Sequence, residues 1–325
     1  MTTKTILTLN IIFCTATLFG ITPTDFPALV QERYHGNMPL VNISFDTSMR
    51  QEKYAWIITR TNTQDEVGVP GEWLYNFFKK QWSSYTYDAL TDCNTLRVPK
   101  IIHQIWFGDD VPAELKPFQK LWQLLHPDWE YHLWTQDNID QLPLTNRRFI
   151  DAAQNPAEKA DLLRLELLYL FGGVYIDMDF EPLAPIDLLN YCYDFYIGID
   201  PLDCGMVQLG SGIIGAIPQH PLIKACLDGI PANYANPALV NCITRKTGPV
   251  HITQQFILHA GKHGLRDCAL PASYLYPMGA TEDYYAPEQW VAHGGLCVHH
   301  WAKTWNKPHY RRARFRNVKS WGTLL

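Results

Sequence analysis

Two aspartates separated by one residue mark the stretch LLYLFGGVYIDMDF, residues 167–180, which holds the only D-x-D in the chain. Side chains alternate between the two faces of a strand, so a strand here would point Asp177 and Asp179 the same way and Met178 the other way. Two adjacent carboxylates repel each other, and a compact divalent cation bound between them removes that repulsion. The spacing therefore predicts a metal site at Asp177 and Asp179.

The segment before the D-x-D is predicted to be a helix that presents polar groups to the same site. Residues 155–173, NPAEKADLLRLELLYLFGG, begin with Asn155 as an N-cap and stop at Gly172. Asp161 and Arg164 share one helix face, opposite a face of leucines. One interpretation is a surface ion pair of little energetic value. The neighbouring D-x-D favours another, in which Arg164 forks onto phosphate or hydroxyl groups and Asp161 accepts hydrogen bonds from sugar hydroxyls. The two glycines would then let the backbone pass close to a bulky ligand.

The elements around this helix predict an α/β fold with a mostly parallel central sheet flanked by helices. Strands are predicted within 98–108, 129–135 and 174–180, and helices within 112–127 and 155–173. Further along, strands are predicted at 193–200 and within 294–305, and helices at 220–230 and 247–264. Ligands bind at the carboxyl ends of the strands of such sheets, where Asp177 and Asp179 lie.

Length and composition limit the classes of protein. The chain has 325 residues, 47% of them hydrophobic, which allows one large or two modest domains. A net charge of -5 does not favour nucleic-acid binding. The eight cysteines contain no C-x-x-C, which argues against a zinc ribbon or a thioredoxin-type site. Seven cysteines remain outside the apolar N-terminus, so the alternatives are buried free thiols or one or two disulfide bridges.

The two ends of the chain differ from its centre. Residues 1–25 are predicted to be a cleavable signal peptide or an uncleaved signal anchor, with a first buried helix as the alternative. Either signal would place the protein in the secretory pathway or on a membrane rather than in the cytoplasm. Residues 26–97 are predicted to form a helical or irregular extension with a helix near 71–82. Residues 306–325 hold six Lys and Arg and no acidic residue, as in an exposed basic tail.

Several motifs in order resemble glycosyltransferase family 32. They are PKIIHQIWFG, HPDWEYHLWT, KADLLRLELLYLFGGVYIDMD, HPLI, TGP, YLYP and VHHWAKTW, and they span residues 98–305. That family includes the yeast initiating α-1,6-mannosyltransferase and inositol-phosphoceramide mannosyltransferases, and the clostridial glucosylating toxins share its D-x-x-R…GG-x-Y-x-D-x-D core. The resemblance implies a GT-A fold, a divalent metal, usually Mn²⁺ or else Mg²⁺, and a nucleotide-sugar donor. It also implies retention at the anomeric carbon and a glycan, glycolipid or protein acceptor.

The resemblance assigns roles by position. It implies that Ile105, Trp106, Asp161, Arg164, Tyr175, Asp177 and Trp305 bind the donor, that Asp177, Asp179 and His299 hold the metal, and that Asp177, Asp179 and Arg164 carry catalysis. Asp177 would contact the metal through water and Asp179 directly. His299 is expected to be the ligand rather than His300, with Lys303 or Lys307 adding charge under a lid closed by Trp305. The sequence departs from the family pattern at Ser211 and Thr304, which affects expectations for the acceptor and the loop.

The chemistry agrees with these assignments. Cleavage of a sugar–diphosphate bond leaves a diphosphate with growing negative charge, which a divalent cation stabilises. Two carboxylates and an imidazole suit Mn²⁺ or Mg²⁺ better than zinc. Alternatives are a metal-dependent phosphoester or diphosphate hydrolase, a sugar-binding protein with a decayed site, and a protein-glucosylating effector. The donor stays open among UDP-Gal, UDP-Glc, UDP-GlcNAc and GDP-Man.

Overall fold

The computed structural model describes residues 43–60, 67–86, 90 and 93–302. The predictions for residues 1–25 and 306–325, and those for Lys303, Thr304, Trp305 and Lys307, lie outside the described residues. In the described ranges, no helix combines the length and the apolar character needed to cross a membrane.

The described chain alternates helices and strands along most of its length. The strands are β1 (Ile101–Ile105), β2 (Glu130–Trp134), β3 (Gly173–Ile176), β4 (Phe180–Pro182), β5 (Phe195–Ile199), β6 (Leu209–Ala216), β7 (Asp267–Leu270) and β8 (Cys297–His299). The α-helices are α3 (Phe45–Ser48), α4 (Gln51–Ile58), α5 (Gly71–Tyr85), α6 (Lys116–Leu125), α7 (Arg147–Ala152), α8 (Pro156–Phe171), α9 (Asp187–Cys192), α10 (Pro221–Ala235), α11 (Ile243–Lys246), α12 (Pro249–His259), α13 (Ala272–Leu275) and α14 (Pro287–Ala292). Short 3₁₀ turns lie at Gln136–Asn138, Leu202–Cys204, Pro237–Leu239 and Lys262–Gly264.

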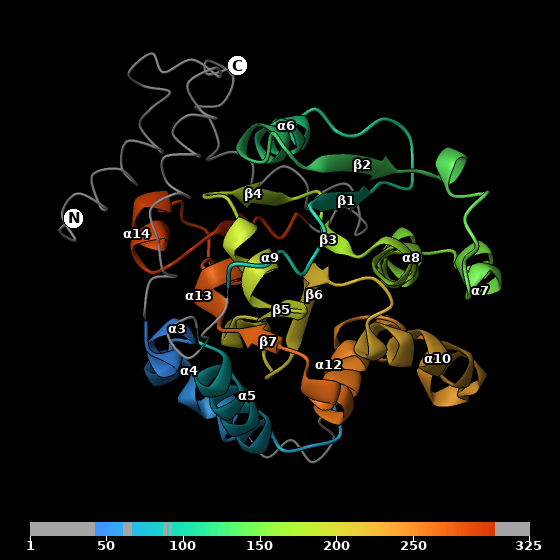
Figure 1. The fold of residues 1–325 in the computed structure, drawn as a ribbon. Coiled ribbons are helices and arrows are strands. Elements are labelled where there is room, and N and C mark those ends of the chain that lie inside the picture. Colours follow the sequence, from blue (N-terminus) through green and yellow to red (C-terminus); the bar gives the residue numbers. More distant parts are fainter. Residues whose placement is uncertain (1–42, 61–66, 87–89, 91–92, 303–325) are drawn as a thin grey trace.

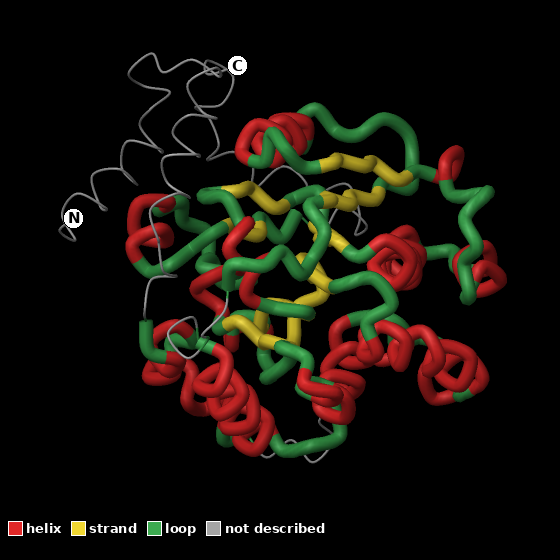
Figure 2. The backbone as a smooth tube through the Cα atoms, viewed as in Figure 1, coloured by secondary structure: helices red, strands yellow, loops and turns green. Residues whose placement is uncertain are grey.

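A six-stranded sheet forms the centre, in the order β2-β1-β3-β6-β5-β7, and helices surround it (Figures 1 and 2). β1 pairs in parallel with β2 and β3, and β5 pairs in parallel with β7. Only β6 runs antiparallel to its two neighbours in this sheet. The predicted α/β fold with a mostly parallel sheet flanked by helices is therefore confirmed. The sequence analysis missed β6 and β7.

The D-x-D does not lie within a strand, so the strand predicted over 174–180 is wrong in its second half. β3 ends at Ile176, and a turn follows in which the Phe180 amide donates to the Asp177 carbonyl at 3.1 Å. The chain then leaves the central sheet, and β4 pairs antiparallel with β8 in a two-stranded sheet of its own. The turn, rather than strand alternation, brings the two aspartates together.

The long helix α8 is buried on all sides, because it packs between the sheet and the helices α7 and α10. Asn155 caps it by accepting from the Ala157 amide at 2.8 Å, and Gly172 ends it with a φ of 65°. A side chain at Gly172 would meet Pro218 at 2.7 Å, and one at Gly173 would meet the Ile101 carbonyl at 2.7 Å. These glycines therefore serve close packing of the protein on itself, and the expected close approach to a ligand stays a prediction.

The helices before residue 98 pack into the same core as the sheet. Phe78 and Trp82 of α5, a helix predicted near 71–82, belong to the main hydrophobic cluster. The Gln81 side chain hydrogen-bonds the backbone of Asp267 and Ala269, at the start and in the middle of β7. Helix α5 is thus part of the globular unit that carries the sheet.

Candidate active site

Three side chains from two distant segments converge at the carboxyl end of β3. Asp177 and Asp179 come from the turn after β3, and His299 ends β8, which lies beside β4. One ligand atom from each of the three lies within 4.8 Å of the other two. Within the described part of the chain, this is the one group of at least three His, Cys, Asp and Glu side chains placed to share an ion.

Asp179 is the less exposed of the two aspartates. Its Oδ1 lies 3.2 Å from Nε2 of His299, and its Oδ2 accepts from the Ala302 amide at 2.7 Å. Burial alone would raise the pKa of Asp179, but His299 and the Ala302 amide outweigh burial and hold it at about 2. This carboxylate is therefore ionised and aimed at the histidine.

His299 packs against two aromatic rings. Phe180 stacks on it at 4.5 Å between ring centroids, and Trp301 lies at 4.2 Å. Burial would lower the pKa of His299, but the charge of Asp179 outweighs it and the pKa is raised. The Nδ1 atom is buried and has no hydrogen-bond partner. Nε2 is the nitrogen that faces Asp179, and an imidazole nitrogen beside two carboxylates suits a cation that takes oxygen and nitrogen ligands.

Asp177 is the more open aspartate, with its side chain 29% exposed. The Tyr175 hydroxyl donates to its Oδ1 at 2.5 Å, and its amide donates to the Gly212 carbonyl at 2.7 Å. Burial raises the pKa of Asp177, and the charge of Asp179 adds to this, against the effect of Arg164. A bound cation would lower the cost of ionising both carboxylates.

Arg164 is buried, with 5% of its side chain exposed, so the surface ion-pair interpretation is wrong. Its Nη2 lies 3.1 Å from Asp161 Oδ1 and 3.5 Å from Asp177 Oδ1. The guanidinium covers the Tyr175 ring at 4.4 Å and donates to the carbonyls of Ser211 and Ala160. Arg164 thus links the α8 carboxylate to the D-x-D, and its donors are mostly used within the protein.

Asp161 contacts the segment TGP, residues 247–249. The Thr247 hydroxyl donates to Asp161 Oδ2 at 3.1 Å, and a side chain at Gly248 would meet the same oxygen at 3.0 Å. Burial raises the pKa of Asp161 to about 6, although Arg164 acts in the opposite direction. The motif therefore needs glycine because the backbone passes directly over this carboxylate.

The first strand reaches the same edge of the sheet. Ile105 is buried at the end of β1, which is parallel to β3, and Trp106 follows it. Trp106 donates from Nε1 to the Asp109 carbonyl at 2.7 Å and packs on the small cluster that contains Met178. Of the predicted donor-binding residues, Trp106, Asp161, Arg164, Tyr175 and Asp177 lie around the D-x-D turn, and Ile105 lies at the end of β1 on the same edge of the sheet. Trp305 lies outside the described residues.

His300 is directed away from the three predicted ligands. Its Nε2 lies 2.8 Å from Oε2 of the buried Glu181, and its ring stacks on Phe118 at 4.8 Å. The Tyr285 hydroxyl donates to the other oxygen of Glu181 at 2.7 Å. The geometry thus agrees with the choice of His299 over His300 as the candidate ligand.

Sequence reasoning missed a further buried carboxylate next to the site. Asp200 follows β5, accepts from Gln208 Nε2 at 2.8 Å and lies close enough to His299 and Asp177 to interact with their charges. Burial raises the pKa of Asp200 to about 6. The rule that singled out Asp177, an acid at the carboxyl end of a strand, also applies to YIGID, and it would have found this residue.

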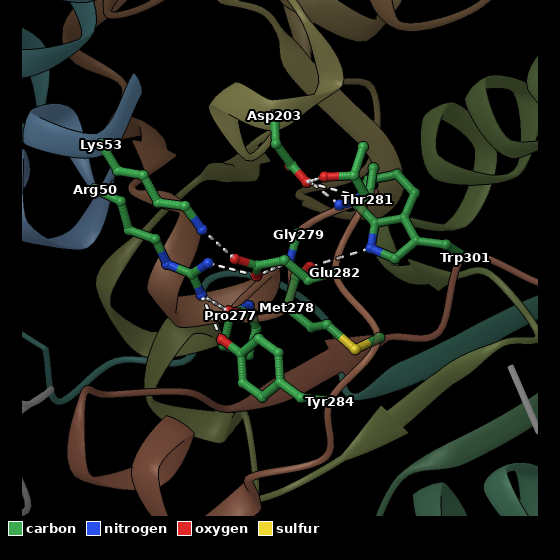
Figure 3. A network of polar contacts seen from close by, with 11 residues as sticks. Arg50, Lys53, Asp203, Pro277, Met278, Gly279, Thr281, Glu282, Tyr284 and Trp301 are labelled. Carbon is green, nitrogen blue, oxygen red and sulfur yellow. Dashed lines mark hydrogen bonds and ion pairs between the residues drawn. The ribbon is translucent and has the colours of Figure 1, made fainter. Parts of the chain in front are cut away.

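A polar network steadies the segment that follows His299 (Figure 3). Trp301 donates from Nε1 to the Met278 carbonyl at 3.1 Å. The loop that holds Met278 is fixed by Glu282, which accepts from the Gly279 amide at 2.8 Å and pairs with Arg50 and Lys53 near α4. Asp203 accepts from the amides of Ala280 and Thr281. Helix α4 is thus connected, through one loop, to the ring that packs on His299.

Comparisons with known proteins find similarity to sugar transferases over part of the chain. Residues 112–196 match the family "Glycosyltransferase sugar-binding region containing DXD motif". The chain is 33% identical over 174 residues to inositol phosphoceramide mannosyltransferase 2 of Schizosaccharomyces pombe, covering 51% of this chain and 48% of that protein. It is 29% identical to the mannosyl phosphorylinositol ceramide synthase SUR1 of Saccharomyces cerevisiae, and the match covers 45% of this chain and 43% of that protein. The chain thus spans about half the length of these curated relatives.

A solved structure, PaToxG glycosyltransferase, overlaps with a TM-score of 0.43 at 17% identity, covering 57% of this chain and 76% of that one. The match over residues 112–196 and the named relatives confirm the predicted resemblance to DXD-containing sugar transferases.

Proposed function

We propose that this protein is a metal-dependent, retaining glycosyltransferase that moves a hexose from a nucleotide sugar to an acceptor. The observation that carries the proposal is the convergence of Asp177, Asp179 and His299 beside the buried pair Asp161–Arg164. Paired carboxylates alone also fit other metal enzymes. A buried acid on α8, tied by arginine to the D-x-D, adds a group suited to sugar hydroxyls.

Asp177, Asp179 and His299 would hold a divalent cation, Mn²⁺ or Mg²⁺, with oxygen ligands and one nitrogen. When bound, the cation neutralises charge on the departing diphosphate. Asp179, whose pKa is about 2, supplies a permanently ionised carboxylate on the His299 side. Asp177, more exposed and hydrogen-bonded by Tyr175, faces the donor.

Arg164 takes a different role from the one that the sequence favoured. Its contacts with Asp161, Asp177 and the Ser211 carbonyl leave few donors for a phosphate. We assign it the positioning of both carboxylates, with Asp161 accepting hydrogen bonds from the transferred sugar. We assign no side chain as a covalent nucleophile, and we propose a front-face displacement with retention of configuration, as the resemblance to retaining sugar transferases implies.

The relatives favour one donor and one acceptor class. Both named relatives carry mannose and inositol phosphoceramide in their names. We therefore favour GDP-mannose among the sugar nucleotides and a glycolipid with an inositol phosphate head group as acceptor. A signal or anchor in residues 1–25 would place this reaction at a membrane of the secretory pathway.

A donor screen tests the proposal. Full-length protein, purified in detergent, is incubated with UDP- and GDP-sugars and Mn²⁺, and release of the nucleoside diphosphate is measured with and without EDTA. We expect metal-dependent hydrolysis of one donor, strongest for GDP-mannose, and transfer to inositol phosphoceramide when it is added. Hydrolysis of bis(p-nitrophenyl) phosphate without cleavage of any sugar nucleotide would replace the proposal with the hydrolase alternative. Transfer of labelled sugar only to proteins would support the effector alternative.

A further inference from the structure

Two cysteines that take no part in the candidate active site lie in direct contact. Sγ of Cys192 lies 2.8 Å from Sγ of Cys93, and both are recorded as free thiols. Cys192 is the buried last residue of α9, and Cys93 lies, partly exposed, in the segment that leads to β1. We propose that Cys93 and Cys192 form a disulfide bond when the protein is in an oxidising environment.

Hydrogen bonds hold the segment before β1 against helix α9 close to the two cysteines. The amides of Arg97 and Val98 both donate to the Asn190 carbonyl, at 2.9 and 3.1 Å. The Asn190 side chain donates back to the Pro99 carbonyl at 3.2 Å, and Arg97 pairs with Asp194 at 2.9 Å. These contacts hold residues 97–99 against the end of α9, and Cys93 lies four residues before them with its sulfur already on Cys192.

The separation of the sulfur atoms is close to that of a bond. A disulfide has an S–S length of about 2.05 Å, so formation from 2.8 Å moves the two atoms together by about 0.8 Å. A contact of 2.8 Å also requires that both side chains point at each other. Such convergence is the main geometric condition for a bridge.

The exposure of the two thiols indicates the order in which they react. Cys93 is the more exposed thiol, so its thiolate attacks a small-molecule disulfide and releases one small thiol. Cys192 then gives up its proton and attacks Cys93 Sγ, releasing the second small thiol. Burial raises the pKa of Cys192, and its neighbour Cys93 raises it further, which suits the resolving role better than the first attack. The two protein thiols are oxidised and one small-molecule disulfide is reduced to two thiols.

Other described cysteines are less suited to pair with Cys192. Cys242 contacts the Thr244 hydroxyl at 3.4 Å, and Cys297 donates to the Leu275 carbonyl. Cys268 interacts with Cys192 but has the Tyr193 hydroxyl as its hydrogen-bond partner. A Cys192–Cys268 bridge is therefore the alternative pairing that an experiment must distinguish.

Peptide mapping tests the bond directly. Full-length protein is dialysed against a mixture of reduced and oxidised glutathione at the poise of an oxidising compartment, and free thiols are alkylated before digestion without reductant. Trypsin leaves Cys192 and Cys204 on one peptide, residues 165–224, so chymotrypsin is added to cut between them at Tyr193 and Phe195. We expect a cross-link between the peptides that contain Cys93 and Cys192, which disappears on reduction.

Thermal unfolding gives a second readout. The bridge would join residues 99 positions apart, and we expect reduction to lower the Tm of the wild type by about 5 °C. Cys93→Ser should remove this dependence on reductant, because the partly exposed site tolerates a hydroxyl. Cys242→Ser, also at a partly exposed cysteine, should keep it.

Two results would overturn the proposal. One is full alkylation of both Cys93 and Cys192 after exposure to oxidised glutathione, in protein whose melting curve shows that it is folded. The other is a cross-link from Cys192 to Cys268 instead of Cys93.

Discussion

Two carboxylate–histidine pairs lie next to each other between β4 and β8, and they differ in what surrounds them. Asp179 and His299 lie 3.2 Å apart beside Asp177, with the Nδ1 atom of His299 unsatisfied. Glu181 and His300 lie 2.8 Å apart, and they also contact Tyr285 and Phe118. The first pair has Asp177 as a third candidate ligand, and within the described residues the second pair belongs to no such group of three. Similar residues one or two positions apart can therefore serve a site in one case and the core in the other.

We expect the largest loss of activity from a substitution at Asp179. Asp179→Asn keeps the shape of the side chain but removes the charge that a cation needs. Because a bound metal supplies several kcal/mol of charge stabilisation, we expect kcat/KM for sugar transfer to fall by about 10²–10³-fold. Donor hydrolysis by purified protein measures this, with a melting curve as control for folding. Turnover near that of the wild type in Mn²⁺ would rule out a metal role for this carboxylate.

We expect a smaller loss of activity from a substitution at His299. His299→Ala removes the only nitrogen from the candidate ligand set, and we expect the Mn²⁺ concentration for half-maximal activity to rise by about 10–100-fold. Titration of activity with Mn²⁺ measures the shift. Added imidazole should restore part of the activity, which a purely structural role would not predict.

His300→Ala should act on stability rather than on metal dependence. It leaves Glu181, which is 2% exposed, without one of its partners, and we expect a loss of about 1–3 kcal/mol in the free energy of unfolding. Urea unfolding gives the stability, and the Mn²⁺ titration should match that of the wild type. If His300→Ala changed the Mn²⁺ titration and His299→Ala did not, the assignment of the two histidines would be reversed.

We expect the smallest effect, a loss of stability, from a substitution at Glu282 in the polar network that contacts Trp301. Burial alone would raise the pKa of Glu282, but Arg50, the Gly279 amide and Lys53 lower it from 4.5 to about 2. Because the pKa is lower in the folded state, Glu282 stabilises the protein above pH 4.5, and this contribution is lost as the pH falls toward 2. Glu282→Gln should therefore be less stable than the wild type by about 1 kcal/mol at pH 7.

Urea unfolding at several pH values checks this prediction for Glu282. The difference between wild type and Glu282→Gln should shrink between pH 4.5 and about 2. A difference that stays constant over that range would show that the carboxylate charge does not stabilise the loop.

The sequence predicted most of the sheet and the helix that bears Asp161 and Arg164, because apolar periodicity and caps are local signals. Asn155 and Gly172 bound α8 within one residue of the expected ends. Asp177, Asp179 and His299 also lie together in the structure, and their role as metal ligands stays a prediction.

The parts that sequence analysis missed depend on contacts between distant segments. The D-x-D lies in a turn because β4 leaves the central sheet to pair with β8, which begins more than a hundred residues later. Arg164 is buried because α10 and the sheet cover two sides of α8. The sequence of α8 alone does not show that these elements pack on it. Gly172 and Gly173 are required by Pro218 and Ile101, whose positions depend on the folded sheet.

The bond from the Ala302 amide to Asp179 spans 123 residues, and this distance has a consequence during synthesis. At a translation rate of 5–20 residues per second, about 6–25 s separate the appearance of Asp179 from that of the segment that completes its surroundings. The nascent chain therefore passes through a stage in which both aspartates are present but His299 is not. A chain that stalls or is cut after β7 and before His299 would hold all six strands of the central sheet and both aspartates, and quality-control factors would meet these carboxylates without their histidine.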